Sequence, residues 1–131
     1  MYGKSYIASD SILPLMKIRK ETLEFILEAC RRTYPKEFIG LLRTKRGIIS
    51  EVLVIPGSKF ESYSSTLRRD MVPMDPSIVG SVHSHPGRPI ASKADINFFS
   101  KFGKIHLIVG YPFSSSDIAV YGTDSKLEIV K

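Results

Sequence analysis

The chain has 131 residues, of which 43% are hydrophobic and 24% charged, with 9 glycines and 8 prolines. This composition excludes a disordered tail, a collagen-like fibre and a low-complexity linker. We expect one domain spanning residues 1–131, because a chain of this length forms a single unit with its own core. The single cysteine, Cys30, excludes an intrachain disulfide and a cysteine-rich zinc finger, and it fits a reducing, cytoplasmic location.

Charge and hydropathy restrict the partners. The 19 basic and 13 acidic residues give a formal net charge of +6. Nucleic-acid binders concentrate their basic residues in one stripe, whereas those of this chain are dispersed. The charge therefore indicates attraction to an acidic partner rather than nucleic-acid binding. No apolar run approaches the ~18 residues that cross a bilayer, and residues 1–10 lack the apolar region of a signal peptide, so we expect no membrane association.

The first half of the chain predicts a helix followed by a β-hairpin. Apolar residues recur at helical spacing in residues 20–32, with Cys30 on the apolar side as a core residue. Residues 1–15 are expected to form a flexible extension or an extra edge strand. The other expected elements are, in chain order, a buried strand at 37–43, a turn at 45–47, a strand at 48–55, a loop at 56–65 and a strand at 66–71.

The second half predicts further strands and one helix. Phenylalanines at helical spacing within residues 92–102 are expected in the core, and Gly103 ends that helix. His106 lies inside an apolar strand and is expected to be packed and hydrogen-bonded rather than a metal ligand. The order of elements predicts a mixed α/β fold with helices on the faces of a strand-rich sheet. The elements are a strand at 80–85, a turn at 86–91, the helix at 92–102, and strands at 104–111, 117–121 and 127–130.

The chemically informative residues lie in the window HSHPGRPIASKAD, which runs from His83 to Asp95. Alternate residues of a strand share one side, so the imidazoles of His83 and His85 emerge together, with Cα atoms ~6.6 Å apart. The Pro- and Gly-rich turn that follows brings Asp95, in the first turn of the next helix, back toward them. Two histidines, one carboxylate and an open fourth position are the ligand set of a catalytic zinc, one ion per chain, rather than of a structural zinc.

Hydrolysis at such a site also needs a general base. A zinc ion lowers the pKa of its water toward ~7, and Glu37 is the preferred acceptor of the proton. Glu37 stands at the head of an apolar run, where a half-buried carboxylate would have a raised pKa suited to acid–base catalysis. Glu51 is the rival base, but strand alternation points it outward. Ser92 is expected to stabilise the oxyanion of the tetrahedral intermediate, and Ser92 with Asp95 also matches a helix capping box.

These residues together resemble the signature of the JAMM (MPN+) zinc metalloproteases, most closely the small archaeal and bacterial single-domain members. The resemblance covers about residues 18–121 and implies a cytidine-deaminase-like architecture, in which helices flank a mixed, mostly antiparallel, curved β-sheet. It also implies the roles of zinc ligand, general acid/base and oxyanion stabiliser. The matching positions are Glu37 (acid/base), His83-Ser84-His85-Pro86 (two ligands), Ser92 (oxyanion) and Asp95 (third ligand).

The resemblance further implies hydrolysis of the isopeptide or peptide bond after the C-terminal glycine of a ubiquitin-like modifier, or processing of a sulfur-carrier protein. The partner would be that modifier or its conjugate. Six residues separate His85 from Ser92, one fewer than is usual in the family, so a tighter turn is expected. The alternative is a non-catalytic, zinc-stabilised binding module, which the shorter turn favours and Glu37 disfavours. Exposed strand edges leave a homodimer open.

Overall fold

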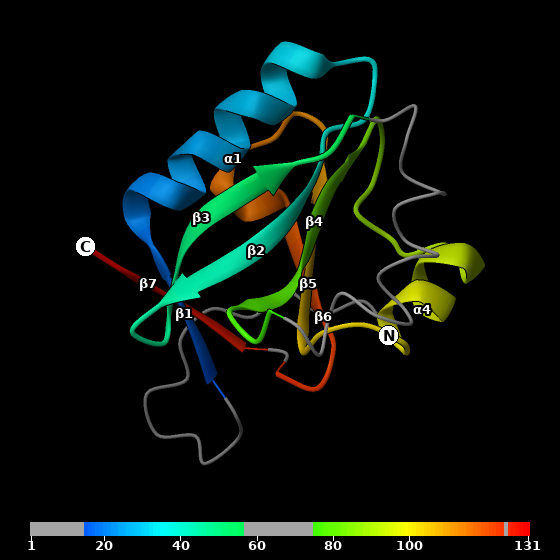
Figure 1. Cartoon of the computed structure of the whole chain (residues 1–131). Helices are drawn as coiled ribbons and strands as arrows, with labels where there is room; N and C mark the ends of the chain where they lie inside the picture. Colours follow the sequence, from blue (N-terminus) through cyan, green and yellow to red (C-terminus); the bar gives the residue numbers. More distant parts are fainter. Residues whose placement is uncertain (1–14, 57–74, 125) are drawn as a thin grey trace.

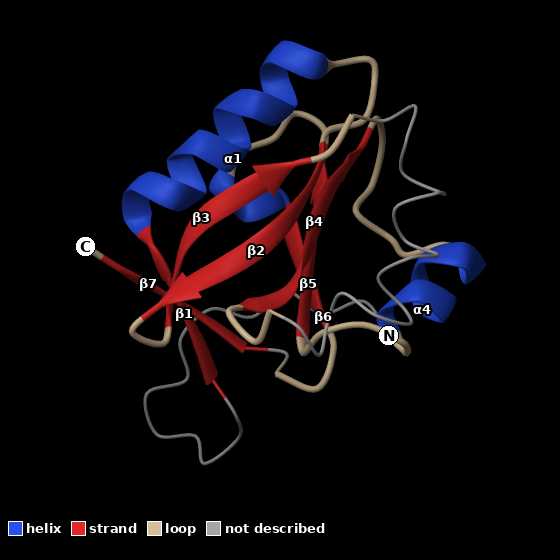
Figure 2. Ribbon diagram, viewed as in Figure 1, coloured by secondary structure: helices blue, strands red, loops and turns tan. Residues whose placement is uncertain are grey.

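A computed structural model describes residues 15–56, 75–124 and 126–131. Figures 1 and 2 show a central sheet with helices packed beside it. The elements are β1 (Leu15–Arg19), α1 (Lys20–Thr33), β2 (Ile39–Lys45), β3 (Ile48–Val54), β4 (Ile78–His85), α4 (Lys93–Phe99), β5 (Ile105–Gly110), the 3₁₀ turn η3 (Ser115–Asp117), β6 (Ile118–Tyr121) and β7 (Lys126–Val130).

The described strands form one seven-stranded sheet in the order β6-β5-β4-β2-β3-β1-β7. Antiparallel ladders join β2 to β3, β2 to β4 and β5 to β6. Parallel ladders join β1 to β3, β1 to β7 and β4 to β5. The predicted mixed, curved sheet flanked by helices is therefore confirmed, and β4, which carries both histidines, lies in its interior.

The two α-helices of the described residues, α1 and α4, cover opposite faces of the sheet (Figure 1). The apolar side of α1 packs into a cluster that includes Val82 of β4 and Leu107 of β5. The other face holds Phe99 of α4 in a cluster with Ile108 of β5 and Tyr121 of β6. Because successive side chains of a strand point to opposite faces, Val82 faces α1 while its neighbour His83 faces α4. The histidine pair is thus presented on the face that α4 covers.

Local sequence accounts for the first helix and the hairpin. Cys30 of α1 is fully buried, as predicted from helical spacing, and the helix ends at Thr33, shortly before Pro35. The β2–β3 turn places Arg46 at φ 54° and Gly47 at φ 78°. Two residues at positive φ make the tight hairpin turn whose twist matches that of the flanking strands. The predicted turn is therefore confirmed at Arg46 and Gly47, whereas Lys45 is the last residue of β2.

Some elements differ from prediction in their bounds, and one strand was not predicted. β2 begins at Ile39 rather than at Glu37, and α4 ends at Phe99 rather than at Phe102, although Phe102 is buried as expected. β1 was not predicted, since its five residues acquire their strand character by pairing with β7 at the other end of the chain.

Some predictions fall outside the described residues. These are most of the extension at 1–15, most of the loop at 56–65 and the strand at 66–71. Of the helices in the described part of the chain, none has the length and apolar character needed to cross a membrane.

Candidate metal centre

β4 delivers the two histidines to one place. His83 and His85 occupy alternate positions at its C-terminal end, and their Nε2 atoms lie 3.2 Å apart. The parallel ladder with β5 pairs His83 with Ile108 and His85 with Gly110. The antiparallel ladder with β2 pairs His83 with Ile39, so β4 is held on both sides. His83 is buried and His85 is partly exposed. The predicted convergence of the two imidazoles on one side of the strand is confirmed.

Asp95 joins them from the first turn of α4. Ser92 is the N-cap of this helix, and its hydroxyl accepts the Asp95 backbone N–H at 3.1 Å. The Asp95 Oδ2 in return accepts the Ser92 backbone N–H at 2.9 Å. This capping box, predicted from the sequence, fixes the carboxylate at the start of the helix. Asp95 Oδ1 lies 3.4 Å from His83 Nε2, and Oδ2 lies 3.3 Å from His85 Nε2.

These distances fit a zinc ion. Ligand atoms at 2.0–2.1 Å from a tetrahedral zinc are separated from one another by ~3.4 Å. The His83 and His85 Nε2 atoms are 3.2 Å apart, and Asp95 places Oδ1 3.4 Å from the first and Oδ2 3.3 Å from the second, so one ligand atom from each residue can reach a common ion. His85 Nδ1 lies 3.3 Å from the Arg88 carbonyl oxygen, to which it can donate. That bond leaves Nε2 free as the ligand atom.

The surroundings of Asp95 favour its ionised carboxylate, the form that can bind a metal ion. Burial of the Asp95 carboxyl opposes its ionisation, but hydrogen bonds with His83 and His85 outweigh burial and hold its pKa well below its usual range. The pKa of His85 is raised, first by its hydrogen bond with Asp95 and to a smaller extent by the charge of Glu37. The carboxylate is therefore negatively charged and ready to bind a cation.

Glu37 lies near His85, since its negative charge contributes to the raised pKa of that histidine. The antiparallel register of Ile39 with His83 extends past the end of β2, because Ser84 N–H donates to the Phe38 carbonyl at 2.9 Å. The Phe38 N–H in turn donates to Ser84 Oγ at 2.8 Å. The expectation of a half-buried Glu37 is wrong, since this residue precedes the strand and is exposed. Its proximity to the histidines, by contrast, follows directly from the register.

Ser92 is exposed and contributes its oxygen to the helix cap. Its hydroxyl hydrogen is not used in that bond and is available for a substrate oxygen. Its catalytic role stays a prediction. The turn at 86–91, although one residue shorter than usual in the family, still brings Asp95 within reach of both imidazoles.

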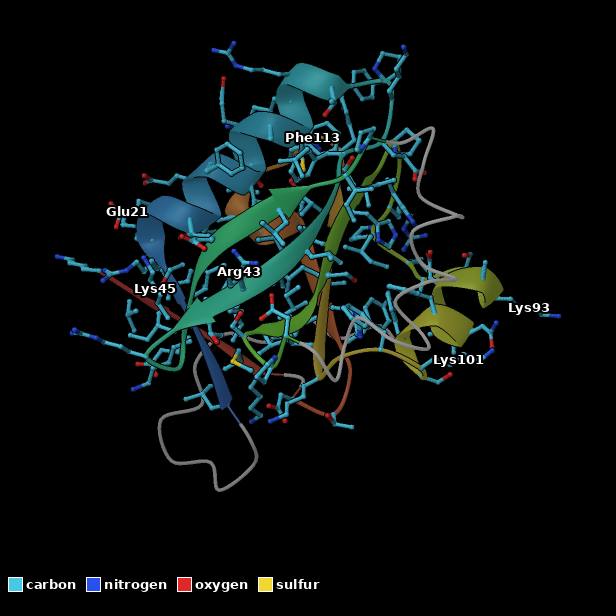
Figure 3. The ribbon with its side chains drawn as sticks, viewed as in Figure 1. Glu21, Arg43, Lys45, Lys93, Lys101 and Phe113 are labelled. Atoms are coloured by element: carbon cyan, nitrogen blue, oxygen red, sulfur yellow. The ribbon has the colours of Figure 1, made fainter. Side chains whose placement is uncertain are left out.

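Glu51, the alternative general base, and His106, the alternative metal ligand, both lie outside the site. Glu51 lies 3.5 Å from Arg43 and 3.8 Å from Lys45, and Figure 3 shows both cations well away from Lys93 on α4. His106 is fully buried with Nδ1 2.7 Å from Ser81 Oγ, which confirms that it is packed and hydrogen-bonded.

Sequence reasoning missed two residues that support the site. Ser84 stands between the histidines on the opposite face of β4, where it holds the segment before β2 in place. Strand alternation could have indicated this, since Ser84 must face the α1 side. Tyr121 was expected only as part of a strand. No local signal relates it to the histidines, because its hydroxyl contacts Ala91 and Pro89, which lie 30 and 32 positions away in the sequence.

Comparison with known proteins agrees with this geometry. Residues 19–121 match the family model of the prokaryotic homologues of the JAB domain. A protein of Haloferax volcanii described as a probable metalloprotease is 40% identical over 113 residues, which cover 76% of this chain and 68% of the relative.

Solved structures place the fold in the same family. A JAB1/MPN domain protein from Archaeoglobus fulgidus is 31% identical, with a TM-score of 0.67 over 88% of this chain and 97% of that one. A structure described as a JAMM metalloprotease-like zinc site in the proteasome and signalosome is 32% identical, with a TM-score of 0.67 over 89% and 99% of the two chains. A Desulfitobacterium hafniense protein shares the fold alone, at 17% identity and a TM-score of 0.55 over 88% and 93%. The chain therefore belongs to the prokaryotic JAB branch of the JAB/MPN domain family, and it is a zinc metallopeptidase of the JAMM type.

Proposed function

We propose that this zinc metallopeptidase is an isopeptidase that hydrolyses the bond after the C-terminal glycine of a ubiquitin-like modifier or a sulfur-carrier protein. One observation carries the proposal: an exposed carboxylate, Glu37, is close enough to His85 for its charge to act on that histidine, beside the group of three possible metal ligands. A structural zinc site has its coordination completed by the protein and has no use for a neighbouring base.

The chain supplies three functions around the reacting bond. His83, His85 and Asp95 would hold the zinc ion, which when bound would supply a Lewis acid and lower the pKa of water for attack on the carbonyl carbon. Glu37 accepts the proton that the attacking water loses and delivers it to the leaving amine nitrogen as the C–N bond breaks. Because Glu37 is exposed, both the water and the amine can reach its carboxylate.

Ser92 supplies the remaining interaction. Its oxygen accepts the Asp95 N–H, so its own O–H can donate to the carbonyl oxygen as negative charge develops there. Being part of the helix cap, the hydroxyl is held in place before substrate arrives. Such pre-positioned donors stabilise the transition state more than the ground state.

The test is a matched pair of carboxylate variants, Glu37→Gln and Glu51→Gln. The substrate is a ubiquitin-like protein whose C-terminal glycine is joined to a lysine side chain. We expect Glu37→Gln to bind one zinc per chain and to lose about 10²- to 10⁴-fold in cleavage rate, as expected for a missing general base. Glu51→Gln, which changes a carboxylate that pairs with Arg43 and Lys45, should cleave at the wild-type rate. Cleavage by Glu37→Gln at the wild-type rate would show that Glu37 is not the base.

Substrate class is tested separately with the wild-type enzyme. Four substrates are compared: a ubiquitin-like modifier joined to a lysine side chain, the same modifier in a linear fusion, a sulfur-carrier protein in a linear fusion, and an unrelated peptide that also contains glycine. We expect chelator-sensitive cleavage of at least one modifier substrate and little cleavage of the unrelated peptide. Equal cleavage of all four would contradict specificity for a modifier while leaving the peptidase assignment intact.

A further inference from the structure

The three metal ligands come from two separate elements, so their relative position depends on the segment between them. His83 and His85 belong to β4, which is held in the interior of the sheet, whereas Asp95 belongs to the short helix α4. The turn at 86–91 is the covalent connection. Conformational freedom in this turn, or a shift in the packing of α4 on the sheet, would move the Asp95 carboxylate away from the imidazoles.

The first half of the turn is held by the end of β5 and the residue that follows it. The Tyr111 N–H donates to the Gly87 carbonyl at 3.0 Å. The turn also lies directly on Gly110, where an added Cβ would stand 2.6 Å from Pro89 Cδ and 2.7 Å from the Gly87 oxygen. A side chain at Gly110 would therefore lift the turn off the sheet, and glycine permits this close approach.

The second half of the turn is held by one side chain, Tyr121 of β6. Its buried hydroxyl donates to the Pro89 carbonyl at 3.2 Å and accepts the Ala91 N–H at 3.1 Å. These bonds close the turn immediately before Ser92, the cap of α4. The hydroxyl thus replaces the backbone partners that the irregular segment lacks.

The same tyrosine ring also seats the helix. Phe99 is one helical turn beyond Asp95, so the two side chains project from the same face of α4. The Phe99 ring lies 5.6 Å from Tyr121 and stacks on His106 at 4.3 Å, with an interplanar angle of 13°. His106 and Tyr121 are directly paired across the β5–β6 ladder. Phe99 is therefore seated on a platform made by these two rings.

We propose that Tyr121 is a positioning residue for the metal centre, whose hydroxyl fixes the turn between His85 and Ser92 and so sets the distance of Asp95 from the two histidines. This inference rests on the zinc site that the proposed function uses. It assigns to β6 a part in metal binding although Tyr121 is not a ligand. It also accounts for how a turn shorter by one residue holds both ligand-bearing elements in register.

The test compares Tyr121→Phe with Tyr111→Phe in the full chain. Each substitution removes one phenolic oxygen and keeps the ring. Tyr111 contacts the turn through its backbone N–H, which Tyr111→Phe retains. Zinc affinity is measured by competition with a chromophoric chelator, and near-UV circular dichroism verifies the fold of each metal-free variant. The cobalt-loaded forms are compared by visible absorption, which reports ligand geometry and is insensitive to a loss of stability elsewhere.

We expect Tyr121→Phe to bind zinc about tenfold more weakly than the wild type and to show altered cobalt bands, as outer-sphere substitutions do. Tyr111→Phe should keep wild-type affinity and spectrum. Wild-type zinc affinity in Tyr121→Phe would overturn the assignment, whatever the stability of that variant. Because no substrate is used, this result is independent of cleavage: a wild type that binds zinc but does not cleave would contradict the proposed function and leave the role of Tyr121 standing.

Discussion

One contribution to destabilisation of this fold by acid is expected from His106. Its side chain is fully buried on β5 against the rings of α4, with Nδ1 2.7 Å from Ser81 Oγ. Among the described residues, its Nε2 has no hydrogen-bond partner. Burial lowers the pKa of His106 to about 4 from a usual value of 6.5. The imidazole is therefore neutral in the folded protein at pH values where it would be charged in the unfolded chain.

The sign and size of the effect follow from proton linkage. Between about pH 6.5 and pH 4 the unfolded chain binds a proton at His106 that the folded chain does not, so stability falls as the pH is lowered through this range. With 1.36 kcal/mol for each pKa unit, the free energy of unfolding should fall by about 2 kcal/mol between pH 7.5 and pH 5 on account of this residue.

The assay is urea denaturation of the wild type and His106→Asn at both pH values, in the presence of a chelator. Asparagine does not titrate in this range but keeps a polar group near Ser81. Every other titratable group is common to the two proteins, so the difference between their free energies of unfolding isolates His106. We expect that difference to shrink by about 2 kcal/mol at pH 5. A difference that does not change with pH would refute the neutral, buried state of His106.

Two further predictions concern packing and metal binding. Gly80→Ala should cost more than about 3 kcal/mol or prevent folding, because the added Cβ would lie 1.6 Å from the Ile105 carbonyl oxygen. Gly87→Ala, where nothing lies within 4 Å of the added atom, should change stability by less than about 1 kcal/mol in the same denaturation assay. Zinc at 100 times its Kd should stabilise the wild type by about 3 kcal/mol, or roughly 10 °C in the melting temperature. Asp95→Asn should lose most of that shift, and a full shift in this variant would remove Asp95 from the ligand set.

Much of the local structure was predictable because it depends on short-range preferences. The helical spacing around Cys30 identified α1, and the Arg46-Gly47 pair marked the hairpin turn. The metal centre was predictable for the same reason. His83 and His85 share a face of any strand, and the Ser92–Asp95 capping box fixes a carboxylate within four residues of chain.

Long-range pairing was not predictable in this way. β1 has only five residues, and its partners are β3 and, from the opposite end of the chain, β7. The exposure of Glu37 depends on where β2 begins, which is set by its pairing with β4 rather than by the apolar run that follows. Local propensity is a weak guide in such segments because tertiary contacts override it.

The sequence by itself determined which atoms can bind the metal and which family the chain resembles, since both depend on residue identity and close spacing. Only the tertiary structure decided how Asp95 is held against the histidines. That depends on Tyr121, a residue of β6 whose hydroxyl meets the turn at Pro89 and Ala91. The physical reason is that an irregular turn has no regular backbone partners of its own, so its hydrogen bonds are completed by whatever side chain the sheet places beside it.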